Sequence, residues 1–137
     1  MYMKQSEIVN QIRIFCDHVE LLPIKADSCH FVYNDRHYIY VSSRDKTLLR
    51  FCIPHLIGMT GFDKDRIVEV VNDTNKNIKY IKAVVLERGS ISLNYDYRIS
   101  CDEPDTNVVR HIIRSLDFAA GYLLNRLKVS PTNPHRL

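Results

Sequence analysis

The sequence predicts a single α+β domain with the order αβββαββα, built on a twisted antiparallel sheet of five strands with helices mainly on one face. Three segments repeat apolar residues with helical periodicity, and the strand-forming segments fall into two antiparallel groups instead of alternating singly with helices. A length of 137 residues suits one domain. We expect residues 1–128 to form it and residues 129–137 to be a frayed tail.

The first helix is predicted from apolar residues that recur at steps of four, three and four. They are Ile8, Ile12, Phe15 and Val19, and polar side chains fall on the opposite side. We expect this helix to end before Pro23.

Three strands follow the first helix. Residues 28–43, SCHFVYNDRHYIYVSS, read as a hairpin whose turn is supplied by Asn34, Asp35 and Arg36. Residues 47–58 predict a third strand, and Pro54 is expected to end it because proline cannot donate a ladder hydrogen bond.

The second helix is predicted within residues 62–77, FDKDRIVEVVNDTNKN, with Asp63 as its N-cap. Asn75 or Asn77 is expected to close its other end, because asparagine tolerates the left-handed conformation of a C-cap. This interpretation makes the asparagine cluster structural and assigns it no chemistry.

The second hairpin and the last helix have the clearest patterns. Apolar and polar residues alternate from Ile91 to Ser100, with a turn at Arg88 and Gly89 before them. After Pro104 the apolar stripe of a long helix runs from Val109 to Leu127.

Composition narrows the classes of protein to consider. The net charge is +3 and the charges are interspersed, a signal too weak to argue for nucleic-acid binding. No window approaches the run of apolar residues that a membrane span needs. Four widely spaced cysteines without a CxxC pair suggest buried free thiols and a cytoplasmic location.

Candidate catalytic and metal-binding residues do not form a recognisable site. Two metal ligands at neighbouring positions of one strand, such as Cys29 and His30, would point to opposite faces, while His37, Cys52 and His55 lack zinc-site spacing. Cys101 near a helix start is the one suggestive nucleophile. We therefore predict a protein without catalytic residues, metal or cofactor.

The chain resembles the bacterial YbjN-like family, which has the type III secretion chaperone-like fold. The resemblance covers nearly the whole chain and rests on the element order, on VVNDTNKN ending a helix just before the strand IKYIKAVV, and on a final hairpin that leads into a long helix near Asp105. It implies a regulatory or chaperone-like binding protein, with no reaction assigned to the end of the middle helix.

The sheet is predicted to carry apolar side chains on both faces. Phe31, Ile39, Val41 and Phe51 are assigned to the face under the helices, together with Ile81, Val85, Leu93 and Tyr95. Three helices can hardly cover a second apolar face as well, so we expect it to bind a protein partner or a second copy of the chain. The residues assigned to partner binding are Tyr38, Tyr40, Tyr80, Val84 and Leu86, which form a sheet face or edge.

Two alternatives remain open at this point. One is a small-molecule-binding or enzymatic domain without a recognisable motif, which would require a concave pocket with converging titratable groups. The other is a nucleic-acid-binding regulator that stacks bases on strand tyrosines.

Overall fold

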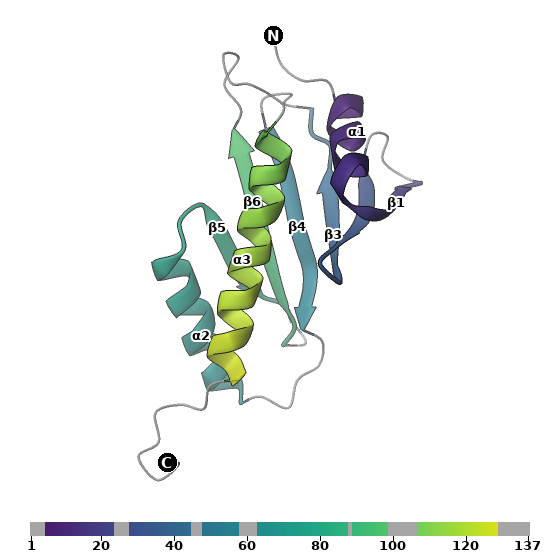
Figure 1. Ribbon diagram of the computed structural model, residues 1–137. Helices are drawn as coiled ribbons and strands as arrows, with labels where there is room; N and C mark the ends of the chain where they lie inside the picture. The colour runs from purple at the N-terminus through teal and green to yellow at the C-terminus, as the bar shows by residue number, and fades with distance from the viewer. Residues whose placement is uncertain are drawn as a thin grey trace.

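The structure, a computed structural model, describes residues 5–23, 28–44, 48–57, 63–87, 89–98 and 107–128. Within these ranges the chain forms three helices and six strands (Figure 1). In chain order they are α1 (Gln5–Phe15), β1 (Asp17–Leu21), β2 (Cys29–Tyr33), β3 (Arg36–Val41), β4 (Leu48–Ile57), α2 (Lys64–Asn77), β5 (Ile81–Val85), β6 (Ile91–Arg98) and α3 (Val108–Lys128). The predicted tail at 129–137, Cys101 and the helix start near Asp105 lie outside the described residues.

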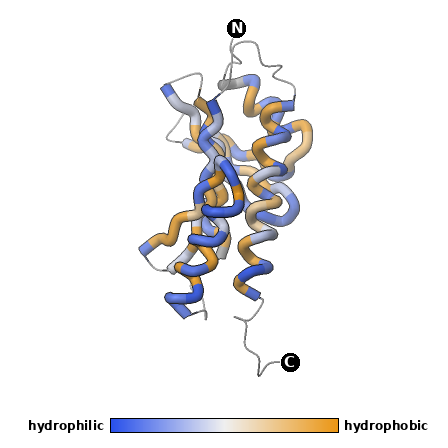
Figure 2. Tube along the Cα trace, turned by 90° about the vertical axis from the view of Figure 1, so that its left-hand side faces the viewer, coloured by the Kyte–Doolittle hydropathy of each residue, from blue (hydrophilic) through white to orange (hydrophobic). Residues whose placement is uncertain are grey.

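The strands form one antiparallel sheet in the order β1-β2-β3-β4-β6-β5. Helix α3 contacts β4 and β6 in the middle of the sheet, while α1 contacts β1 and β2 and α2 contacts β5. Seen from the side, α3 lies along one side of the sheet (Figure 2). The α+β class is therefore confirmed. None of the three described helices is long and apolar enough to cross a membrane.

The sheet has six strands, not the predicted five, because the first helix ends earlier than its periodicity predicts. Helix α1 stops at Phe15, and β1 follows and pairs with β2. Val19 fits a helix because it lies four residues after Phe15. It also fits a strand because it is half-buried between the exposed His18 and Glu20. Pairing with β2 decides between them, and His18, at φ 52°, lies where the register shifts.

The turn between β2 and β3 contains two residues, not the predicted three. Asn34 and Asp35 have φ values of 51° and 62°, and Arg36 already pairs with Tyr33 in the ladder. Positive φ at both central residues is typical of a type I′ hairpin turn, which asparagine and aspartate tolerate. The sequence therefore predicts the correct turn residues and the wrong loop length.

This difference of one residue reverses the faces of β3. Tyr38 pairs with Phe31 on β2, and Tyr40 pairs with Phe51 on β4, so all four rings lie under the helices and are almost fully buried. Ile39, which the sequence assigned to the core, points to the other face. Because side chains alternate between the two faces of a strand, a shift of one residue moves every side chain of β3 to the opposite face of the sheet.

The hairpin turn is fastened to α3 by one carboxylate. The Asn34 amide donates to Asp117 Oδ2 at 3.1 Å, and Arg36 forms a half-buried ion pair with the same side chain. A residue in the middle of α3 thus holds the far end of the β2–β3 hairpin against the helix layer.

Pro54 does not end the third strand. Strand β4 continues to Ile57, and its register against β6 shifts between Ile53 and Ile57, the interval that contains Pro54. An irregularity in the ladder leaves a residue without a partner, which is how a strand accommodates a proline.

The asparagines at the end of α2 do not cap it. The helix begins after Asp63, as predicted, although the Asp63 side chain makes no capping hydrogen bond. Asn75 and Asn77 are both within the helix, and the C-cap is Ile78 in an extended conformation. The prediction of a left-handed asparagine cap is wrong.

Asn75 instead holds the edge strand β5. Its side-chain oxygen accepts a hydrogen bond from the Ala83 backbone N–H at 2.7 Å, and its amide donates to the Ala83 carbonyl at 3.0 Å. The carboxamide thereby occupies the position of a neighbouring strand. Because exposed edge strands pair with other chains, this contact also protects β5 from such pairing.

Candidate functional site

The five residues predicted to bind a partner do not form one surface. Tyr38 and Tyr40 have exposed fractions of 0% and lie in the core, where their rings are 5.3 Å and 4.9 Å from those of Phe31 and Phe51. Tyr80 is 81% exposed. The prediction of one exposed tyrosine face is therefore wrong, because Tyr38 and Tyr40 are inaccessible to a partner.

Val84 and Leu86 lie elsewhere on the second hairpin. Val84 is on β5 and is 38% exposed, whereas Leu86 follows the strand and is partly buried. The Leu86 backbone N–H donates to Ser90 across the turn, so this residue helps to close the hairpin. Neither residue is part of the groove described below.

The sheet face turned away from the helices, called the open face here, is mixed in chemistry. One row of paired residues crosses five strands and consists of His30, Ile39, Cys52, Asn94 and Lys82. Beside this row Arg50 and Asp96 form an exposed ion pair at 3.3 Å. The apolar Ile39 and Cys52 lie between the polar His30 on one side and Asn94 and Lys82 on the other, so the row does not form a continuous apolar patch.

A concave surface lies instead between α3 and the β5–β6 pair. It is a groove of about 1090 Å³ formed by the first half of α3, the end of β6 and the link from α2 to β5. Its apolar and aromatic lining residues are Ile78, Tyr80, Ile81, Tyr95, Tyr97 and Phe118, and its basic ones are Lys79, Arg98, Arg110, His111 and Arg114. We call it the basic aromatic groove.

Helix α3 supplies one wall through a second stripe of residues. This stripe lies beside the buried apolar stripe that faces the sheet. Its members follow one another at steps of four, three and four: Asn107, just before the helix, and then His111, Arg114 and Phe118. Phe118 is 67% exposed even though it is a large aromatic residue. Sequence reasoning missed this stripe because only the apolar stripe of the core was sought. The sequence did contain one signal for it, the large apolar Phe118 four residues after Arg114.

Tyr80 contributes to the opposite wall from a strained backbone position. Its φ is 69°, in the left-handed region that a residue with a bulky side chain rarely adopts. The ring is mostly exposed, so burial does not offset the cost, which is about 1–2 kcal/mol. Strain of this kind is concentrated at functional sites.

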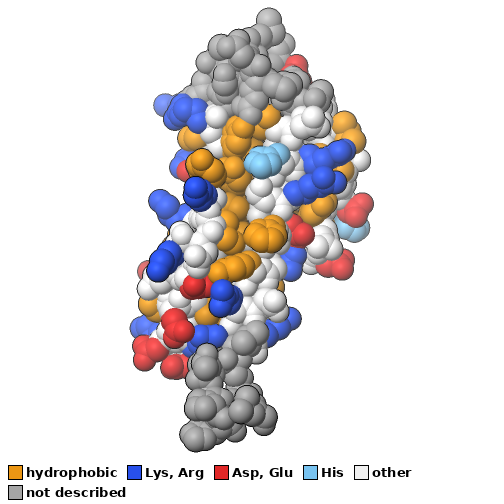
Figure 3. All heavy atoms as spheres, turned by 60° about the vertical axis from the view of Figure 1, so that its left-hand side comes forward, with side chains coloured by type: hydrophobic (Ala, Val, Ile, Leu, Met, Phe, Trp, Pro, Cys, Tyr) orange, Lys and Arg blue, Asp and Glu red, His pale blue; other side chains and the backbone are white. Residues whose placement is uncertain are grey.

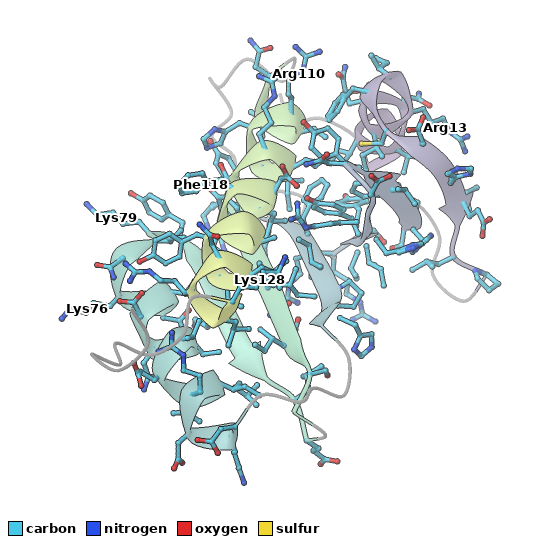
Figure 4. All side chains as sticks on the ribbon, turned by 60° about the horizontal axis from the view of Figure 1, so that its bottom comes forward. Arg13, Lys76, Lys79, Arg110, Phe118 and Lys128 are labelled. Carbon is cyan, nitrogen blue, oxygen red and sulfur yellow. The ribbon has the colours of Figure 1, made fainter. Side chains whose placement is uncertain are left out.

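Figure 3 shows the face that contains α2, α3 and the β5 edge. Apolar side chains form a band along the middle of this face, and Lys and Arg side chains lie on both sides of it. Figure 4 shows the labelled Phe118 between Arg110 and Lys79, and all three line the groove. The groove thus combines apolar side chains on its walls with cations around them.

The groove has more positive than negative charge. Asp96 is the single acidic residue among its described lining residues, and it is paired with Arg50 on the open face. Arg110 lies over the Phe15 ring at 5.3 Å. Lys79 and Arg114 form no ion pair among the described residues. Unpaired cations in a concave surface attract anionic ligands.

The cysteines of the described chain are free thiols. Burial raises the pKa of the Cys16 thiol to about 12 and that of Cys29 to about 11. Burial also raises the pKa of Cys52, which lies on the open face. All three thiols therefore stay protonated near neutral pH, the form that is a poor nucleophile.

The histidines and cysteines considered as metal ligands are divided between the two faces of the sheet. Cys29 lies in the core, while His30 and His37 stack on the open face with His30 Nε2 and His37 Nδ1 3.0 Å apart. Among the residues that the structure describes, no three His, Cys, Asp or Glu side chains form a group that could hold a metal ion.

Comparison with known proteins supports the fold and leaves the function unassigned. No family model matches the sequence, and no curated protein matches it either. The crystal structure of an uncharacterized protein from Methanothermobacter thermautotrophicus is similar, with a TM-score of 0.64 and 10% sequence identity. The match covers 92% of this chain and 97% of that one, and at this identity it indicates a shared fold alone.

Proposed function

We propose that this protein is a non-catalytic binding module that holds a segment of a protein partner in the basic aromatic groove. The observation that supports this most is the exposure of Phe118 and Tyr80 on opposite walls of one concave surface. Aromatic residues and arginine are enriched at protein interfaces, and Phe118 and Tyr80 are available without rearrangement of the core. A regulatory or chaperone-like role, in line with the YbjN-like resemblance, and a cytoplasmic location belong to the same proposal.

The groove is a better candidate than the open face. The loss of Tyr38 and Tyr40 to the core leaves the open face with half-buried aliphatic side chains and paired charges. The groove, at about 1090 Å³, is at the upper end of the size of small-molecule pockets, which measure roughly 300–1000 Å³ and enclose most of the ligand. It is open to solvent, and an open groove suits a polypeptide segment better than a small ligand that must be enclosed.

Selection from a random peptide library displayed on phage tests the proposal. The wild-type protein should enrich a set of related peptides, and Phe118→Glu should abolish their binding because it places a carboxylate on an apolar wall of the groove. Ile14→Glu is the matched control, since Ile14 is 68% exposed on α1, outside the groove. Circular dichroism should show that both variants fold. Peptides that bind Phe118→Glu as well as they bind wild type would contradict the proposal.

A further inference from the structure

The charges of the groove indicate what kind of segment it binds. Lys79 lies on the link from α2 to β5, and Arg110 and Arg114 lie one turn apart on α3, so cations come from two separate elements. Among the described lining residues the one acid is Asp96, which is already within 3.3 Å of Arg50. With a neutral or basic segment, Lys79 and Arg114 would have no counter-charge from the described part of the chain.

The apolar side chains on the walls narrow the choice of ligand further. Phe118 lies between the labelled cations Arg110 and Lys79 in Figure 4. A single-stranded nucleic acid could stack bases on Phe118 and Tyr80, but it would make no use of the aliphatic Ile78 in the same lining, and a net charge of +3 is low for a nucleic-acid-binding protein. A polypeptide can place apolar side chains on Phe118 and acidic side chains next to Lys79 and Arg114, which satisfies both features.

We infer that the partner segment is an acidic polypeptide stretch in which glutamate or aspartate residues flank apolar or aromatic side chains. This inference rests on the proposed function and specifies its ligand. Apolar contact with Phe118 and Tyr80 supplies most of the affinity. Attraction to Lys79, Arg110 and Arg114 selects acidic segments over neutral ones and accelerates their association.

Fluorescence anisotropy with two synthetic peptides tests the inference. One labelled peptide alternates glutamate with leucine and phenylalanine, and the other has glutamine in place of every glutamate. The acidic peptide should bind more tightly at low salt, and its advantage should shrink as salt rises because the charges are screened. Arg114→Gln should weaken its binding about threefold to tenfold. The control is Arg13→Gln, because Arg13 is an exposed arginine on α1, outside the groove.

The possible outcomes separate this inference from the proposed function. Equal binding of the two peptides, with both lost in Phe118→Glu, would overturn the acidic preference and leave the binding groove in place. Failure of the acidic peptide to bind would also overturn the inference, and the display selection would then judge the groove independently. Tighter binding of a labelled single-stranded oligouridine, with the same loss in Arg114→Gln, would overturn both in favour of a nucleic-acid ligand.

Discussion

At the scale of single residues, the informative positions are those where local preference and observed conformation disagree. Tyr80 has a backbone conformation suited to glycine, and its ring is exposed to solvent. Phe118 is an exposed aromatic residue on a helix whose other large apolar residues are mostly buried. Natural sequences depart from local rules mainly at functional sites. Both exceptions lie on the same groove, which is why we give them weight together.

Replacement of Tyr80 by glycine should stabilise the fold and weaken binding. Glycine relieves the left-handed strain but loses more chain entropy on folding, so the free energy of unfolding should rise by about 0.5–1 kcal/mol in urea denaturation. Lys79→Gly is the control, because Lys79 does not have positive φ and the same change there should destabilise. If Tyr80→Gly lowered stability as Lys79→Gly does, the strain at this position would have no energetic consequence.

At the scale of secondary-structure elements, the sequence predicts which segments are helices and strands better than it predicts how they pair. The alternation of β6 and the apolar stripe of α3 are long, so their type is unambiguous. Whether the β2–β3 turn has two or three residues is a small local difference, yet it decides that Tyr38 and Tyr40 are core residues. Strand β1 was missed because five residues that also fit a helix acquire their strand conformation from pairing with β2.

Contacts between elements were also beyond prediction from local patterns. The asparagine cluster was predicted to close a helix, whereas Asn75 of this cluster hydrogen-bonds Ala83 on an edge strand. Asp73 of the same helix likewise accepts a hydrogen bond from the Tyr122 hydroxyl of α3 at 2.9 Å. A cap can be predicted from its own segment, whereas these partners are known only once α2, α3 and β5 are placed together.

Removal of the Asn75 side chain should therefore destabilise the edge of the sheet. Asn75→Ala loses two hydrogen bonds to Ala83, and we expect the free energy of unfolding to fall by about 1–2 kcal/mol. Hydrogen exchange at the Ala83 amide should accelerate, and the variant should self-associate through β5 at high concentration. Asn72→Ala is the control, since Asn72 is an exposed residue of the same helix. Equal stability and equal Ala83 exchange in Asn75→Ala and Asn72→Ala would show that the hydrogen bonds from Asn75 to β5 do not stabilise the sheet edge.

At the scale of the whole molecule, the helices leave two different surfaces. All three cover one face of the sheet, and the open face carries a mixture of polar and apolar side chains. Because α3 crosses the middle of the sheet and α2 lies against β5, a groove remains above the end of β6. Sequence reasoning anticipated an uncovered apolar surface and assigned it to the sheet. The position of α3 on the sheet cannot be predicted from a local sequence pattern. Because of this position, the candidate site lies at the edge of the helix layer and not on the sheet.

The most direct test of the binding groove is a nuclear magnetic resonance titration of the isotope-labelled protein with a peptide from the display selection. We expect the backbone amide signals of Tyr80, Arg114 and Phe118 to shift as the peptide is added, while those of His30 and Ile39 on the open face stay in place. Shifts that gather on His30 and Ile39 and spare the three groove residues would contradict the account.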